Sequence, residues 1–157
     1  MYARLIAEKL LNHKLTIATA ESVTGGLLSS SLTDIAGASR FFKGAIVAYS
    51  NELKKSLLNV KQSILINHGA VSRYCVREMA LGLMQKLNVD IAVACSGVAG
   101  PDALENQAVG SLFFCVIVAN KAYDFETKLP AGSRNELRQL FVQKILQTVE
   151  HILSEIS

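Results

Sequence analysis

The stretch TIATAESVTGGLLSSSL, residues 16–32, decides the fold, because it contains the point at which a buried strand gives way to a helix. The short apolar run over residues 15–19 is typical of a buried strand, and residues 25–35 are typical of a helix with a glycine-rich start. Strands that alternate with helices indicate an α/β fold. A carboxylate and two hydroxyls lie between these two elements, where Gly25-Gly26 leave the backbone bare.

The alternation of strands and helices continues along the chain. Apolar residues at helical spacing predict helices over residues 2–13, over 72–88 with Ser72 as the N-cap, and from about Ser133 onward. A shorter helix is predicted after Asn51, which we expect to be its N-cap. Four further strands are predicted over residues 44–50, 90–96, 111–119 and 121–129, the last two paired as a hairpin around Asn120-Lys121.

Apolar strands that alternate with helices predict a sheet covered by helices on both faces. We therefore expect an α/β fold, a three-layer α/β/α sandwich with a mixed, mostly parallel sheet, in which the hairpin supplies the antiparallel part. The 157 residues fit a single domain, residues 1–157, and half of them are hydrophobic, which is enough for a substantial core. In such sheets ligands bind at the loops beyond the carboxyl ends of the strands.

Charge and composition argue against several classes of function. The net charge is only +3, and Lys43 and Lys54-Lys55 do not form a dense basic block, so we expect no nucleic-acid partner. We also expect no membrane association, because no apolar run is long enough to span a bilayer. The N-terminal segment carries Glu8 in its apolar part and has no small-residue cleavage site, so we expect no signal peptide.

The three cysteines, Cys75, Cys95 and Cys115, form no Cys-x-x-Cys pair. An odd number of cysteines in a small apolar domain predicts reduced, buried thiols in a cytoplasmic protein. Their spacing relative to the histidines does not match a metal site, so we expect no bound metal.

The first loop at the expected ligand edge is AESVTGG, residues 20–26. A helix that starts at Gly25-Gly26 has free backbone N–H groups and a positive dipole end, which can hold a phosphate or stabilise a developing oxyanion. Ser22 lies just before that helix, so its hydroxyl is either a helix cap or a nucleophile. Capping is the commoner role of such a serine, and this loop alone does not decide between the two.

A serine nucleophile needs a base, and Lys54 is an attractive candidate. Lys54 falls in the first turn of the short helix after Asn51, where a positive charge is disfavoured, and burial would disfavour the charge further. Both effects favour the neutral amine that a general base must have. The alternative is an ordinary surface lysine. Tyr49, at the end of the preceding strand, either relays a proton or orients the amine, or is a half-buried strand aromatic.

Another informative loop is SGVAGPD, residues 96–102. Gly97 and Gly100 flank a turn, and glycines there let a ligand approach the backbone closely. The alternative is a simple connection between two strands.

Taken together, these loops resemble the CinA carboxy-terminal domain family, which includes stand-alone nicotinamide-nucleotide amidohydrolases. The resemblance covers most of the chain and rests on several motifs in a specific order. They are AESVTGG at 20–26, GASRFF at 37–42, YSNELK at 49–54, SGVAGPD at 96–102 and GSRNELR at 132–138.

The resemblance implies hydrolysis of the carboxamide of nicotinamide mononucleotide to nicotinic acid mononucleotide and ammonia, in pyridine-nucleotide recycling. It implies neither a metal nor an organic cofactor. It places a serine nucleophile at Ser22 and a lysine base at Lys54, with Tyr49 beside them. The candidate contacts to the small-molecule nucleotide substrate are Thr24, Gly25 and Gly26 around the oxyanion, Arg134 at the phosphate, Gly97 and Gly100, and, as second choices, Ser39 and Arg40. The alternative for Arg134 is a surface helix residue.

The sequence departs from the family pattern in three of these motifs, one of them the GDR-type element, which here reads Gly132-Ser133-Arg134. Val23 stands where the family usually has cysteine, and residues 103–108 read ALENQA where the family usually has a glycine pair followed by Lys-Pro. Two alternatives to an active enzyme are therefore a degenerate member that binds a nucleotide-like ligand without turnover, and an interaction module of a competence or DNA-damage pathway. We also expect a homo-oligomer, since many small α/β domains assemble in this way.

Overall fold

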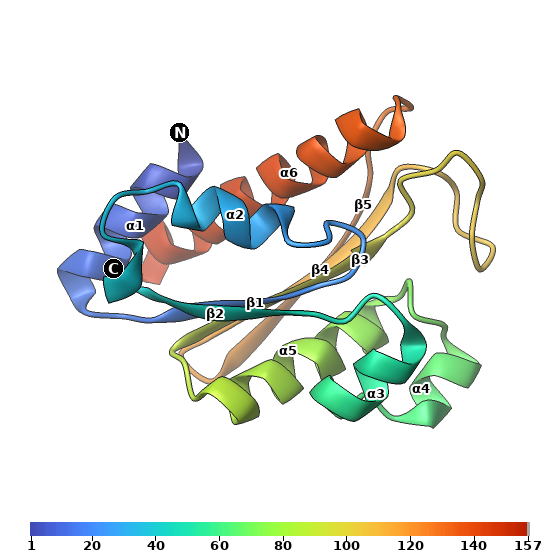
Figure 1. Ribbon diagram of the computed structural model, residues 1–157, viewed down its shortest axis with the longest axis horizontal. Helices are drawn as coiled ribbons and strands as arrows, with labels where there is room; N and C mark the ends of the chain where they lie inside the picture. Colours follow the sequence, from blue (N-terminus) through green and yellow to red (C-terminus); the bar gives the residue numbers. More distant parts are fainter. Residues whose placement is uncertain (157) are drawn as a thin grey trace.

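A five-stranded sheet lies at the centre of the computed structural model, which describes residues 1–156 (Figure 1). The strands lie in the order β2-β1-β3-β4-β5. Their bounds are Ile17–Glu21 for β1, Phe42–Val47 for β2, Ile91–Gly97 for β3, Ser111–Val118 for β4 and Lys121–Lys128 for β5. The helices are α1 (Tyr2–His13), α2 (Leu27–Thr33), α3 (Asn51–Leu58), α4 (Gln62–Asn67), α5 (Arg73–Leu87) and α6 (Arg134–Ile156), with a short 3-10 turn, η1, at Ala38–Arg40.

The sheet is mixed. Strand β1 is parallel to both β2 and β3, whereas β4 is antiparallel to both β3 and β5, so β4 alone runs against the other strands. Helices α1, α2 and α6 cover one face, and α3, α4 and α5 cover the other (Figure 1). The predicted three-layer α/β/α sandwich is confirmed. Within residues 1–156, no helix is both long and apolar enough to cross a membrane.

The N-caps of two helices test the local predictions. The predicted cap of α5 is confirmed, because the Ser72 hydroxyl accepts a hydrogen bond from the backbone N–H of Cys75 at 3.2 Å. The predicted cap of α3 is wrong by one residue. Ser50, not Asn51, is the N-cap, and its hydroxyl accepts from the N–H of Leu53 at 3.1 Å.

Some element boundaries also differ from the prediction. Strand β1 continues to Glu21, two residues beyond the predicted end, because neighbouring groups satisfy the buried carboxylate. Helix α2 begins only at Leu27, and helix α4 was not predicted. The hairpin turn lies at Ala119 and Asn120, which have positive φ angles, one residue before the predicted position.

Small side chains set the position of α5 and, through it, of α3. The residues of β1 and β3 that face α5 are Ala18, Ala20, Ala92 and Ala94. Helix α3 packs on α5 at Gly82, where a Cβ atom would lie 1.9 Å from the carbonyl oxygen of Leu58. A larger residue at position 82 would therefore push α3 away from α5.

Glu21 is a fully buried carboxylate at the end of β1. Its favourable partners are the N–H groups of the first turn of α2, which have no acceptors within the helix, and the positive end of the helix dipole. The carboxylate accepts hydrogen bonds from the N–H groups of Gly26 (3.1 Å), Leu28 (2.9 Å) and Ser29 (2.9 Å) and from the hydroxyls of Thr24 (2.6 Å) and Thr19 (3.3 Å). These bonds hold the loop between β1 and α2 in one shape.

Replacement of Glu21 by alanine is expected to lower the free energy of unfolding by about 3 kcal/mol or more, because each buried donor left without an acceptor costs about 1–3 kcal/mol. Urea denaturation measures this change. Glu21→Gln keeps one carbonyl acceptor and should lose less, and Glu8→Ala, on the exposed side of α1, is the control. A loss below about 1 kcal/mol in Glu21→Ala would contradict this role.

Candidate active site

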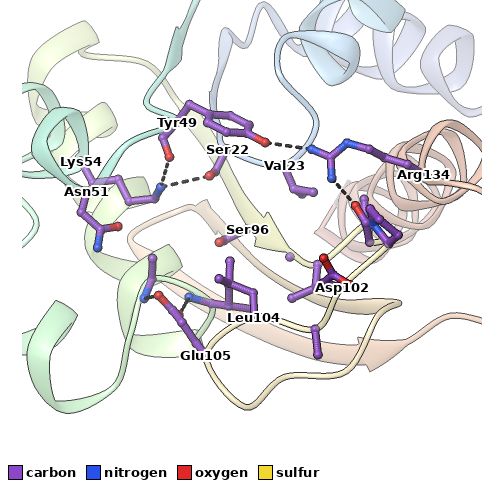
Figure 2. A pocket seen from close by; sticks show the side chains of 18 residues that line it. Ser22, Val23, Tyr49, Asn51, Lys54, Ser96, Asp102, Leu104, Glu105 and Arg134 are labelled. Carbon is purple, nitrogen blue, oxygen red and sulfur yellow. Dashed lines mark hydrogen bonds between the residues drawn. The ribbon is translucent and has the colours of Figure 1, made fainter.

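A cavity of about 300 Å³ opens at the carboxyl ends of β1 and β3 (Figure 2). Open α/β sheets bind their ligands at this edge. The walls come from the loops after β1, β2 and β3, from the start of α3 and from the start of α6. The lining includes Ser22, Val23, Tyr49, Asn51, Lys54, Ser96, Gly97, Gly100, Asp102, Leu104, Glu105 and Arg134.

Ser22 and Lys54 meet in this cavity, although they are 32 positions apart in the sequence. The Lys54 Nζ lies 3.0 Å from Ser22 Oγ and 2.9 Å from the backbone carbonyl oxygen of Tyr49, and it donates to both. Lys54 is only 2% exposed and Ser22 only 8% exposed. Neither the surface-lysine alternative nor the helix-cap alternative describes these residues. A contact of this kind is the one that a serine nucleophile and a lysine base require.

Burial lowers the pKa of Lys54 below its ordinary value of 10.5. Cys75, Glu105 and Cys95, in that order, oppose this shift when they are ionised. Burial raises the pKa of each of the two thiols to about 12, so both thiols stay protonated near neutral pH. Among these three groups, Glu105 is therefore the one whose negative charge holds the Lys54 pKa up, while burial holds it down.

Tyr49 acts on the pair through its backbone rather than through its ring. Its carbonyl oxygen orients the Lys54 amine, whereas its hydroxyl accepts a hydrogen bond from Arg134 Nη2 at 2.9 Å (Figure 2). Arg134 Nη1 donates to the carbonyl oxygen of Gly100 at 2.6 Å. A guanidinium has five N–H donors, so Arg134 keeps donors for a ligand at the cavity wall.

In the loop between β1 and α2, the N–H groups of Gly25 and Gly26 are not available as the oxyanion donors that the sequence predicts. The N–H of Gly25 donates to the carbonyl oxygen of Ser22 at 3.0 Å, and the N–H of Gly26 donates to Glu21. Both glycine N–H groups are thus engaged, that of Gly25 by the Ser22 carbonyl and that of Gly26 by the Glu21 carboxylate. Within residues 1–156, nothing accepts a hydrogen bond from the N–H of Val23 or of Thr24. Val23 lines the cavity, so its N–H becomes the candidate donor, whereas Thr24 is fully buried and does not line the cavity.

Two predicted contacts lie elsewhere. Ser39 and Arg40 belong to η1, which precedes β2 and lies at the opposite end of the sheet from the cavity (Figure 1). The sequence motif that contains them is close to Tyr49 along the chain, but the length of β2 separates the two. Gly97 and Gly100 do line the cavity. At Gly97 a Cβ atom would lie 2.6 Å from the carbonyl oxygen of Ser111, so strand packing also requires that glycine.

Four polar residues of the cavity lining were not predicted as site residues, namely Asn51, Ser96, Asp102 and Glu105. Ser96 is 2% exposed at the end of β3 and faces the cavity (Figure 2). Glu105 accepts hydrogen bonds from the N–H groups of Ala70 (3.2 Å) and Val71 (2.9 Å), and it thereby ties the loop after β3 to the segment before α5. The sequence signal for Glu105 was its place in the unusual 103–108 segment.

Comparisons with known proteins agree on one family. A family model described as the CinA C-terminal domain matches residues 1–153. The chain is 99% identical to "Protein MG115 homolog" of Mycoplasma pneumoniae and 52% identical to "Protein MG115" of Mycoplasma genitalium, each over 157 residues and 100% of both chains. It is 41% identical to a CinA-like protein of Thermotoga neapolitana over 96% of this chain, which spans 37% of that protein.

Solved structures share the fold. Competence damage-inducible protein A from Klebsiella pneumoniae superposes with a TM-score of 0.94 at 30% identity, over 98% of this chain and 95% of that chain. A competence/damage inducible protein from Agrobacterium tumefaciens superposes with a TM-score of 0.92 at 32% identity, over 98% of this chain and 93% of that chain.

Replacement of Lys54 by methionine is expected to raise the free energy of unfolding by roughly 1 kcal/mol near neutral pH, because a buried amine with a lowered pKa costs stability. The unfolded chain binds more protons than the folded one between the folded pKa and 10.5. Wild-type stability should therefore rise with pH over that window, and the advantage of Lys54→Met should shrink. Urea denaturation at several pH values measures both.

The matched control for this change is Lys55→Met, since Lys55 is the exposed neighbour on the same helix. It should give no gain in stability. A loss of stability in Lys54→Met would mean that Lys54 is a structural residue rather than one retained at a cost.

Proposed function

The chain belongs to the CinA C-terminal domain family, and we propose that it hydrolyses the carboxamide of nicotinamide mononucleotide to nicotinic acid mononucleotide and ammonia. Membership of the family supports an amidohydrolase of the nicotinamide-nucleotide type. The observation that carries the proposal is the buried contact of 3.0 Å between Lys54 Nζ and Ser22 Oγ. Burial lowers the pKa of Lys54, which favours the neutral amine that a base beside a serine hydroxyl needs.

In the first half of the reaction the Lys54 amine takes the proton of the Ser22 hydroxyl. The Ser22 oxygen forms a bond to the carboxamide carbon, and the carbonyl electrons move onto the carbonyl oxygen. The N–H of Val23, which lines the cavity, is the proposed donor to this oxyanion. The intermediate then expels the amide nitrogen, which takes the proton from Lys54 and leaves as ammonia. An acyl ester on Ser22 remains.

In the second half Lys54, again neutral, takes a proton from a water molecule. The water oxygen bonds to the acyl carbon, and the bond between that carbon and the Ser22 oxygen breaks. Lys54 returns its proton to Ser22. The product is the free carboxylic acid, and the pair of residues is restored. One amine thus serves as base and as acid in each half.

Arg134 is the proposed contact for the phosphate of the substrate. It lies at the start of α6 and lines the cavity. A guanidinium is well suited to a phosphate because of its charge and its several donors. Its bonds to Tyr49 and to Gly100 hold the group at the wall before a ligand arrives.

The second candidate function is binding of a nucleotide-like ligand without turnover. The observation that favours it is the 103–108 segment, which forms part of the cavity wall and departs from the family pattern. The Glu105 carboxylate in this segment is close enough to raise the pKa of Lys54. The lysine that the family usually carries in this segment is absent here. Binding without turnover requires that the ligand bind normally while ammonia release is absent.

The first experiment is ammonia release from nicotinamide mononucleotide by the purified protein. We expect turnover, and we expect Ser22→Ala and Lys54→Ala each to lower it by at least about 10³-fold, because both members of a nucleophile–base pair are needed. Lys55→Ala is the matched control and should retain wild-type turnover. Unchanged turnover in Ser22→Ala would remove that serine from the mechanism, and binding without any turnover in the wild type would favour the second candidate.

The pH dependence of kcat/KM is expected to show an acid limb on which activity rises as Lys54 loses its proton, with a midpoint below 10.5. Glu105 raises the Lys54 pKa, so Glu105→Gln should move this midpoint to lower pH. Asp34→Asn, at the end of α2 and outside the cavity lining, should leave it in place. A shift to higher pH in Glu105→Gln would contradict the assigned role of Lys54.

A further inference from the structure

Arg138 lies one helical turn after Arg134 in α6, and its side chain reaches the loop that follows β1. Its Nε donates to the carbonyl oxygen of Val23 at 3.1 Å, and its Nη2 donates to the carbonyl oxygen of Thr24 at 2.8 Å. Arg138 does not belong to the lining of the cavity, so it is not placed to touch a substrate there. It contacts the backbone next to the nucleophile instead.

These two carbonyl groups are connected through peptide units to the two free N–H groups. The peptide unit with the Val23 carbonyl carries the N–H of Thr24. The unit with the Thr24 carbonyl carries the N–H of Gly25, which donates to the carbonyl oxygen of Ser22 at 3.0 Å. The peptide unit that contains the Ser22 carbonyl carries the N–H of Val23. Two chains of polarised groups thus begin at one guanidinium. One ends at the N–H of Val23, which lines the cavity, and the other ends at the N–H of Thr24, which is fully buried.

Hydrogen bonds in such chains polarise one another, and a charged donor gives the stronger bonds. A guanidinium on the carbonyl oxygen draws electron density away from the N–H of the same peptide unit. It also fixes the plane of that unit. Both effects favour the binding of negative charge at the far end of the chain.

We propose that Arg138 is a positioning residue that holds the loop after Ser22 and polarises the Val23 N–H as the oxyanion donor beside Ser22. The proposal rests on the proposed function, in which Ser22 is the nucleophile. Arg138 stabilises the oxyanion and leaves the affinity for the uncharged carboxamide unchanged. Its removal therefore lowers kcat and not the binding of substrate.

The test is the rate at which a small alkyl fluorophosphonate modifies Ser22, measured with ammonia release from nicotinamide mononucleotide. The Ser22 oxygen bonds to phosphorus, the P–F bond breaks, fluoride leaves and Lys54 takes the hydroxyl proton. The phosphoryl oxygen occupies the oxyanion position during this step. The reagent contains no nicotinamide, so it probes the oxyanion site without relying on the substrate.

The variants are Arg138→Met and Arg138→Lys, with Lys144→Met on a later turn of α6 as the control. In Arg138→Met we expect both the modification rate and kcat to fall by about 10- to 100-fold, which is less than the loss of a whole oxyanion donor because the Val23 N–H remains. KM should stay within about threefold. Arg138→Lys keeps the positive charge but has fewer hydrogen-bond donors, so its modification rate and kcat should be intermediate. Lys144→Met should match the wild type.

A folded Arg138→Met protein that modifies Ser22 at the wild-type rate would overturn the proposal, and so would a rise in KM with kcat unchanged. If Arg138→Met does not fold, modification of Ser22 at the wild-type rate in Arg138→Lys would overturn the proposal. Modification that depends on Arg138, without ammonia release in the wild type, would support this inference and reject the proposed substrate. Failure of the reagent to modify Ser22 in the wild type would overturn both.

Discussion

The buried carboxylate of Glu21 is the interaction on which the arrangement of the site depends. It lies at the end of β1 and accepts hydrogen bonds from the first turn of α2 and from the loop between them. A carboxylate buried away from water needs hydrogen-bond donors from the protein, and the loop must take the one shape that supplies them. As a result the start of α2 is not available to an anion. The N–H groups of Val23 and Thr24 remain free beside Ser22.

The base of the proposed reaction comes from the other face of the sheet. The contact of α3 with Gly82 of α5 brings Lys54 under the end of β1, where burial lowers its pKa. Helix α6 completes the site from the first face. Arg134 binds the loops after β2 and β3, and Arg138 binds the loop after β1. Segments that are far apart in the sequence are thus held at one edge by hydrogen bonds to backbone carbonyls and a tyrosine hydroxyl.

Most of the fold was predictable from the sequence. Apolar periodicity places α1, α5 and α6, and apolar runs place the strands, because burial on a helix face or in a strand follows local spacing. The errors occur where tertiary partners override local preference. Glu21 extends β1 because several donors reach it, and α2 begins later than its glycines suggest for the same reason. Ser50 rather than Asn51 caps α3 because the local backbone presents its hydroxyl to Leu53.

For the site, the sequence by itself determined the chemical groups, the order of the motifs and the family, and it indicated Ser22 and Lys54 as partners. The tertiary structure decided which groups meet. It placed Ser39 and Arg40 at the opposite end of the sheet from the cavity and brought Arg138 to the loop after β1. The physical reason is that these contacts depend on the strand order β2-β1-β3 and on the directions of the strands, which bring distant loops to one edge. Local spacing does not encode that order.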